Sequence, residues 1–432
     1  AMMAQDVLLK RGRRSICALA MDPAWRLCFV TAANCVVITF MYTLAPFAVL
    51  ELGATRDRQA VGFWSGFLVA AFFLARTVTL PLWGRLADRV GRSPVVTASL
   101  LLTGAGTLLC GLSASLEQVA VARLLTGACS AVHACCCALG FQLSGGRGAA
   151  IVESGWSFGK LLGPGLAGAL LRDLQLPGRS SEFHLLAPCA AVALLQLAVV
   201  PMVPSDPPDA AAAEASVKLV PAAGRAAEDA ESATVRRQRS LALQAQLLSA
   251  GLVVVSVAME EAFVLYGVGE LGISAAAVGT VYLVAGAADL LLQNLFLIGL
   301  IERASPEQLV RLRRAALALL SIPLAGLPFA VVPGSGKWTS IVLLGVFCGV
   351  RTATSYVFFV SNMTLLCQAS PGAVARAQSL RMAVGSALQV VGPPLGASAY
   401  AWSATSGLAF PADYHLVFMC SAAWCLCLAA IA

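Results

Sequence analysis

Apolar runs of about 20 residues follow one another along almost the whole of this chain, separated by short polar gaps. A helix that crosses a bilayer needs about 20 consecutive apolar residues, whereas transmembrane strands alternate apolar and polar positions. The 432 residues are 59% hydrophobic, well above the roughly 45–50% of soluble domains. The sequence therefore predicts an all-α integral membrane protein, with the lipid bilayer as its surroundings.

Hydropathy predicts twelve transmembrane helices in two six-helix bundles. The expected spans are Trp25–Leu50, Val61–Trp83, Val95–Leu112, Val119–Phe141, Gly155–Leu171, His184–Val203, Leu241–Val268, Ala275–Ile301, Ala315–Val332, Trp338–Leu366, Ala373–Ala401 and Tyr414–Ala432. The interval 204–240, rich in Ala, Pro and charge, predicts a flexible linker. The expected order is thus an N-terminal segment (1–24), a bundle (25–203), the linker (204–240) and a second bundle (241–432).

Basic residues concentrate in alternate loops. Arg85, Arg89 and Arg92 follow the second span, and the linker holds five Lys and Arg residues. The loops on the opposite side hold only Arg56, Arg58, Arg172, Arg179 and Lys337. Cytoplasmic loops are enriched in Lys and Arg, so both termini and the linker are expected in the cytoplasm. The net charge of +7 is scattered over these loops, which argues against a nucleic-acid partner. The pattern leaves open whether the membrane is the plasma membrane or that of a vacuole-like organelle.

Nearly all of the fourteen Cys residues lie in apolar runs, where Cys behaves as a small hydrophobic residue. His133, Cys129 and Cys137 share one helical face, a spacing that could bind a soft metal. A His among small residues of a span is more typical of packing, so we expect no metal site and no cofactor. The loops show no pairing of a nucleophile with a base, and we expect no enzymatic activity.

One charged stretch, "GRLADRVGR", interrupts the apolar sequence after the second span. Gly84 and Gly91 permit a tight turn and close helix approach, and Asp88 can meet the positive N-terminal end of a neighbouring helix. Arg89 and Arg92 can anchor the turn at the cytoplasmic face. The stretch resembles the signature of the major facilitator superfamily between its second and third spans. That resemblance implies a gating role for these residues and a two-bundle transporter fold.

Two further motifs are similar to those of this family. "RLLTG", Arg123 to Gly127, resembles the Arg-x-x-x-Gly of the fourth span, with Thr where the family often has Gln. The fifth span carries small residues and a proline in the pattern of the antiporter branch, namely Gly159, Gly163, Pro164 and Gly168. Small residues on one face allow close helix packing, and a proline bends the helix there.

The text around Arg76, "VGFWSGFLVAAFFLARTVTLPLWGRLADRVGRSPVV", resembles zinc-induced facilitator-like and tetracycline-resistance-like drug:proton antiporters. This likeness extends to "MEEAFVLYGV" in the second half. The corresponding loop of the second half, "IERASPEQLVRLRR", lacks the Gly and Asp of the signature. The sequence therefore does not predict the same gating motif in both halves. The resemblance implies a small-molecule substrate, protons as coupling ions and a monomer.

Ionisable groups at membrane depth are costly unless paired or wetted, so each is a functional candidate. Seven qualify: Arg76, Arg123, Lys160, Glu260, Glu261, Asp289 and Arg351. We expect Glu261 to be the proton-linked acid and Arg123 to be its partner across the two halves. Alternatively, Glu260 and Glu261 lie at the outer mouth. Asp289 and Arg351 fall near the bilayer centre, either as a structural ion pair or as substrate contacts.

These features favour proton-coupled export of a small organic molecule, drug or metal chelate by alternating access. A uniporter or proton symporter of a small solute is the alternative within transport. The alternative from another class is a transporter-like receptor that moves no substrate.

Overall fold

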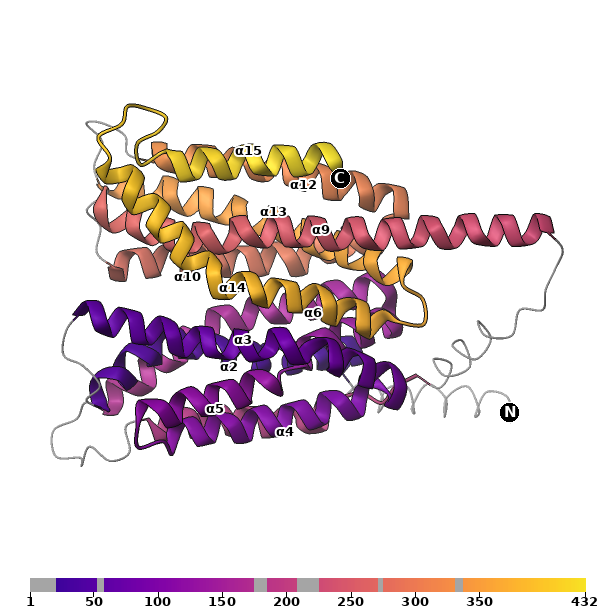
Figure 1. Cartoon of the computed structure of the whole chain (residues 1–432), viewed down its shortest axis with the longest axis horizontal. Coiled ribbons are helices and arrows are strands. Elements are labelled where there is room, and N and C mark those ends of the chain that lie inside the picture. The colour runs from indigo at the N-terminus through magenta and orange to yellow at the C-terminus, as the bar shows by residue number, and fades with distance from the viewer. Residues whose placement is uncertain (1–20, 53–57, 175–184, 208–224, 271–274, 331–336) are drawn as a thin grey trace, which may run out of the picture.

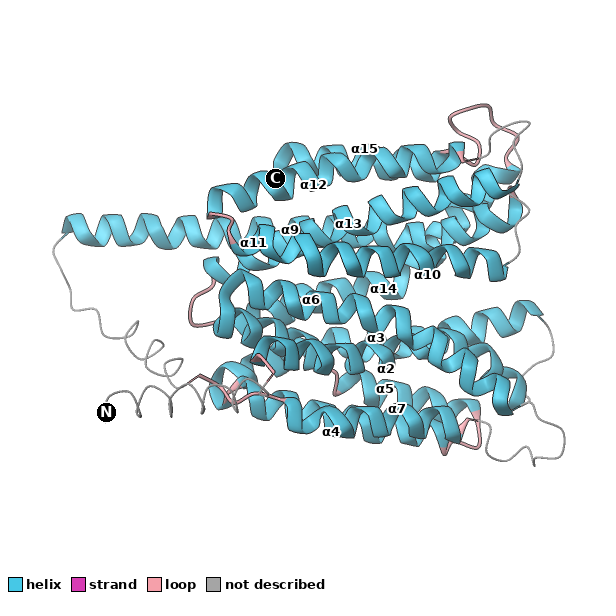
Figure 2. Ribbon diagram, turned by 180° about the vertical axis from the view of Figure 1, so that it is seen from behind, coloured by secondary structure: helices cyan, strands magenta, loops and turns pink. Residues whose placement is uncertain are grey.

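The computed structural model describes residues 21–52, 58–174, 185–207, 225–270, 275–330 and 337–432. Every regular element in these ranges is helical, and the helices form two bundles side by side (Figures 1 and 2). At some positions inside the helices, including Glu260, Glu261 and Gly168, only the backbone element is described. The predicted all-α membrane fold is confirmed.

The N-terminal bundle contains α2 (Pro23–Glu51), α3 (Arg58–Val90), α4 (Arg92–Gly111), α5 (Leu116–Ala128), α6 (Val132–Leu174), α7 (Leu186–Val199) and the 3-10 turn η2 (Val200–Met202). Helix α6 reverses direction at Ser144 and Gly145, whose backbone angles are not helical. Gly148 then packs closely against Gly140. Helix α6 is therefore a hairpin that holds the end of the fourth predicted span and all of the fifth.

The C-terminal bundle contains α9 (Arg225–Gly269), α10 (Ala275–Leu292), the π-helical turn η3 (Gln293–Leu297), α11 (Ile298–Glu302), α12 (Pro306–Gly326), the 3-10 turn η4 (Leu327–Phe329), α13 (Lys337–Ala369), α14 (Val374–Thr405) and α15 (Leu416–Ile431). By length and composition, eight helical segments of the described ranges can cross a membrane, and two shorter apolar helices accompany them. One of the eight segments contains the α6 hairpin. With α14, the two bundles accommodate the twelve predicted spans.

Two predicted spans are interrupted. The fourth breaks between Ala128 and Val132, where the Ser99 hydroxyl of α4 binds the carbonyl of Cys129 and the N–H of Ala131. The eighth contains the π-helical turn η3, and such turns are frequent at functional sites. Hydropathy could not show either break, because the residues on both sides stay apolar.

The predicted linker also differs from the structure in its second part. Helix α9 begins at Arg225, so residues 225–240 extend this helix beyond the bundle (Figure 1). Their sequence, "RAAEDAESATVRRQRS", is rich in Ala, Glu and Arg, which are strong helix formers. Residues 208–224 of the predicted linker lie outside the described ranges.

Each bundle has its own apolar core, and two further clusters join the bundles. One joining cluster, which we call the inner seal, contains Ala87, Val95 and Cys135 from the N-terminal half and Met363, Cys367 and Ala375 from the C-terminal half. The other packs Ala150 and Ile151 of α6 against residues of α11, α12 and α13. Both joining clusters lie on the side of the molecule that holds the α3–α4 turn and the start of α14.

Candidate functional site

A carboxylate of α3 binds the first turn of α14, in the opposite bundle. Asp88 accepts hydrogen bonds from the backbone N–H groups of Ala375 at 3.2 Å and Arg376 at 3.0 Å. The first N–H groups of a helix have no partner within it, and the helix dipole favours a negative charge there. Arg92 lies 3.4 Å from Asp88 and orients the same carboxylate. We call this contact between α3 and α14 the inner gate.

The glycines of the charged stretch make this geometry possible. A Cβ atom on Gly84 would lie 2.6 Å from the side chain of Ser379 and 2.9 Å from the Cα of Arg376, so only glycine lets α3 approach α14 this closely. Gly91 has a φ of 100°, which side chains rarely tolerate. Arg89 is exposed in the last turn of α3.

Asp206, which the sequence analysis did not single out, holds the other side of this turn. Its carboxylate accepts hydrogen bonds from the backbone N–H of Arg92 at 3.1 Å and of Ser93 at 3.1 Å. It therefore caps α4, whose N-cap residue is Gly91. The sequence signal was weak, because Asp206 lies in a Pro-rich interval 114 residues from Arg92, the first residue of α4.

The predicted antiporter motif lies inside the N-terminal bundle. Gly159 and Gly163 of α6 pack against Ala32 and Thr39 of α2, and Pro164 lies within the same helix. Gly168 lies in α6, and only its backbone element is described. In this structure the motif is a packing face between α6 and α2.

Arg123 is 1% exposed and lies within the N-terminal bundle. It donates a hydrogen bond to the carbonyl of Val37 at 3.5 Å, and its guanidinium lies 4.7 Å from the ring centre of Phe72. The expected pairing with Glu261 stays a prediction, because the side chains of Glu260 and Glu261 are outside the description. The hydrogen bond and the ring contact of Arg123 nevertheless belong to α2 and α3 of its own bundle.

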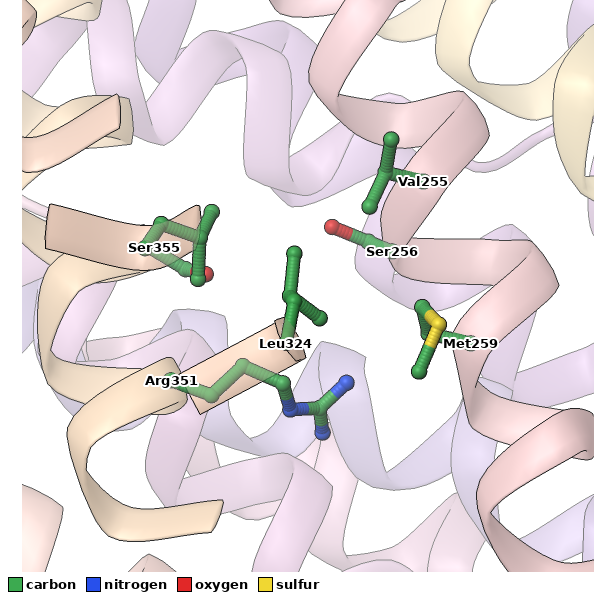
Figure 3. Close-up of a pocket in the computed structure, with 7 residues that line it drawn as sticks. Val255, Ser256, Met259, Leu324, Arg351 and Ser355 are labelled. Carbon is green, nitrogen blue, oxygen red and sulfur yellow. The ribbon is translucent and has the colours of Figure 1, made fainter. Parts of the chain in front are cut away.

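The structure shows different neighbours for Asp289 and Arg351, which were expected either as a structural ion pair or as substrate contacts. Asp289 accepts a hydrogen bond from Gln293 Nε2 at 2.7 Å, one turn along the chain. Arg351 lines a pocket inside the C-terminal bundle with Met259, Leu324 and others (Figure 3). The cavity volume of this pocket is about 10 Å³, far below the roughly 300–1,000 Å³ of small-molecule sites. The sequence placed both residues at similar depth but could not show which neighbours each of them has.

Polar contacts cross between the bundles along α6 and η3. Gln293 donates to Ser157 at 3.2 Å, and Asn294 donates to Ser154 at 3.0 Å. Tyr356 donates to the carbonyl of Ala150 at 2.9 Å. The π-helical turn directs these amide side chains of the C-terminal half toward α6.

A buried acid–imidazole pair lies on the two arms of the α6 hairpin. Glu153 and His133 are 3.2 Å apart, and Trp156 stacks on the imidazole with ring centres 4.2 Å apart. Cys137 completes a group whose ligand-type atoms lie within 4.8 Å of one another. Arg381 and Arg76 are within electrostatic range of His133, and two cations disfavour a divalent metal ion there. The sequence analysis grouped His133 with Cys129 and Cys137 and expected no metal there. In the structure, the third residue of this group is Glu153 and not Cys129.

Glu153 escaped the sequence analysis because the fifth span was expected to begin at Gly155. The predicted boundary was two residues too late, so Glu153 was assigned to a loop.

Arg76, a candidate from the sequence, donates a hydrogen bond to the sulfur of Met382 on α14 at 3.8 Å. Lys160, also singled out, is within electrostatic range of Glu153 and Asp289.

Comparison with known proteins identifies the family. The family model of the Major Facilitator Superfamily matches residues 27–393. The multidrug resistance protein MdtG of Escherichia fergusonii is 34% identical over 153 residues, which cover 35% of each chain. ZINC INDUCED FACILITATOR 1 of Arabidopsis thaliana is 25% identical over 202 residues, 44% of this chain and 41% of the relative. The chain thus aligns with well under half the length of these relatives.

Two solved structures share the fold. The human organic anion transporter MFSD10 superposes with a TM-score of 0.66 at 18% identity, covering 95% of this chain and 99% of the other. The proton:xylose symporter XylE superposes with a TM-score of 0.65 at 13% identity, covering 94% of each chain. The fold and the family model agree with the motifs around Asp88 and Arg123. This chain belongs to the major facilitator superfamily.

Proposed function

We propose that this multi-pass membrane transporter is a proton-coupled antiporter that exports a small organic molecule, drug or metal chelate. The carrying observation is the inner gate, in which Asp88 of one bundle caps α14 of the other. Alternating access requires two halves that close on one side and separate on the other. A charge-assisted contact across the halves is suited to this, because it holds one state and breaks in the next.

The basic loops assign the gate side to the cytoplasm. The inner seal and the contacts of Tyr356, Gln293 and Asn294 lie on that side or towards the centre of the bundles. In this proposal, the structure is the state closed towards the cytoplasm. Both termini and the linker lie in the cytoplasm in this proposal.

Asp289 and Gln293 are the proposed substrate contacts. Asp289 is 7% exposed and Gln293 is fully buried. Within the described part of the chain, one oxygen of each side chain, Oδ1 of Asp289 and Oε1 of Gln293, has no hydrogen-bond partner. Buried acceptors without partners cost free energy, and a donor on a bound substrate would satisfy them. Glu261 stays a prediction for the proton-linked acid.

Transport in proteoliposomes tests the proposal. The purified chain is reconstituted, a pH gradient is imposed, and the movement of ethidium, a zinc–citrate chelate and fluorescein is followed. We expect at least one probe to move faster when the gradient drives protons in the opposite direction, with Asp88→Asn as the inactive control. Equal rates with and without the gradient indicate a uniporter, and movement together with protons indicates a symporter.

A further inference from the structure

We propose that Glu153 and His133 form a proton-binding pair that controls the inner gate through Arg381 of the opposite bundle. This inference rests on the proposed proton coupling and adds the site at which the proton acts. The pair belongs to α6 of the N-terminal half, and Arg381 belongs to α14, the helix that Asp88 caps. The gate and the pair therefore hold the same helix.

Burial strengthens the electrostatic interactions among the charged groups of this cluster. Glu153, His133 and Arg381 are each 9% exposed or less. Arg381 donates to Gln378 at 3.0 Å and to the sulfur of Met363 at 3.9 Å, and within the described residues no carboxylate lies in ion-pair distance of it. A buried guanidinium without a carboxylate is costly. Helices α6 and α14 pack against each other, and Cys137 of α6 and Met382 of α14 lie in the same buried cluster, the inner seal. Glu153 is within electrostatic range of Arg381 across this contact and supplies the compensating charge.

The depths of these groups agree. Arg381 lies seven residues into α14 and Glu153 lies eight residues beyond Gly145, so both are about 10–12 Å from the gate end of their helices. The other groups in electrostatic range of the pair are Arg76 of α3, Lys160 and Cys137 of α6, Cys35 of α2 and Tyr356 of α13. Arg76 and Arg381 bring two positive charges from two helices, one in each half.

Protonation removes the attraction between the pair and Arg381. With Glu153 ionised, its attraction for Arg381 holds α14 against α6 and the inner gate stays closed. A proton on the pair leaves either a neutral carboxyl group or an added positive charge, and the remaining cations repel one another. Protonation therefore favours opening towards the cytoplasm, and release of the proton favours closure. This is the order of events that proton-driven export requires.

Thiol alkylation of the full chain measures the gate without a substrate. Cys367 is 2% exposed in the inner seal and accepts a hydrogen bond from Gln378 at 3.0 Å. Glu307→Cys, at an exposed residue in the first turn of α12, supplies a water-accessible reference thiol in every variant. Glu153→Gln mimics the protonated acid. We expect it to raise alkylation of Cys367 by N-ethylmaleimide at neutral pH about fivefold or more relative to the reference thiol, measured by peptide mass spectrometry.

A double-mutant cycle separates this mechanism from general loosening. Arg381→Gln should open the gate as Glu153→Gln does, and the double variant should add little to either, because both act through one interaction. Glu153→Asp, which keeps the charge, should stay near wild type. Glu117→Gln and Arg311→Gln change exposed charges and should have no effect. Unchanged alkylation in Glu153→Gln, or additive effects in the cycle, overturns the proposal.

The wild-type chain offers a second measurement if Glu153→Gln does not fold. Trp156 stacks on His133, and a protonated imidazole quenches indole fluorescence, so the difference between wild type and Trp156→Phe reports protonation of the pair. Arg381→Gln removes an opposing positive charge and should move the midpoint of this titration to higher pH, by about one unit. A midpoint that does not move overturns the proposal.

The outcomes distinguish this inference from the proposed function. If Glu261→Gln opens the gate and Glu153→Gln does not, the proton does not act at the Glu153–His133 pair. That result overturns this inference and leaves the proposed antiport unchanged. If the Glu153–Arg381 cycle behaves as expected but no probe responds to a pH gradient, the gate is controlled by pH and antiport is wrong.

Discussion

The Oδ2 atom of Asp88 lies 3.0 Å from the backbone nitrogen of Arg376, at the first turn of a helix in the opposite bundle. This contact joins residues 288 positions apart in the sequence. It explains why one carboxylate is placed directly after an apolar span: the negative charge meets the positive end of α14.

Asp88→Asn should reduce transport strongly while the protein stays inserted in the membrane. The amide keeps the size of the side chain but loses the charge that strengthens both N–H contacts. Alkylation of Cys367 in the inner seal should rise together with the loss of transport. Transport equal to wild type would show that the cluster serves only to set membrane topology.

Gly84→Ala should weaken the inner gate, because the new Cβ atom would lie 2.6 Å from Ser379. We expect increased alkylation of Cys367 and reduced transport. Adding Ser379→Gly removes the nearest opposing atoms and should restore part of the closure. If Gly84→Ala alone behaves as wild type, the close approach of α3 to α14 is not what keeps the inner gate closed.

Asp206→Ala should lower the thermal stability of the N-terminal bundle. The carboxylate caps α4 through Arg92 and Ser93, and loss of a helix N-cap costs about 1 kcal/mol. Thermal unfolding in detergent measures the change. Asp206→Asn, which retains one acceptor oxygen, should lose less, and an equal loss in both variants would assign the effect to charge alone.

Asp22→Asn should make stability less dependent on acidic pH. Partial burial of Asp22 opposes its ionisation, but the Arg147 guanidinium 2.7 Å away and the N–H of Ala24 outweigh burial and lower the pKa of Asp22. A lowered pKa contributes stability above the ordinary value of 3.8 that is lost as the pH falls through the folded-state pKa. The melting temperatures of wild type and variant should therefore converge in acid and differ at neutral pH.

Tags placed in the linker 204–240 and beside Arg89 should be reachable only from the cytoplasm, and a tag near Lys337 only from the other side. The prediction follows from the distribution of Lys and Arg over the loops. Reactivity of the linker and Lys337 from the same side would contradict the twelve-span topology.

The sequence by itself determined the membrane environment, the helical fold and the gate motif, because these depend on local composition and on short spacings. Runs of apolar residues require helices in a bilayer, and the Gly–Asp–Gly–Arg pattern lies within nine residues. Only the tertiary structure decided which charges meet. It placed Arg123 inside the N-terminal bundle, gave Asp289 a hydrogen bond from Gln293 and brought Asp206 to α4.

Tertiary structure also explains why the sequence did not predict the contact between Glu153 and His133. Glu153 and His133 are 20 residues apart, and they meet because α6 folds back at Ser144 and Gly145. Hydropathy predicts how deep in the membrane a residue lies along its own helix. The partner of a buried charge depends instead on the direction of its side chain and on which helix packs against it. Those two quantities arise from the packing of the bundles.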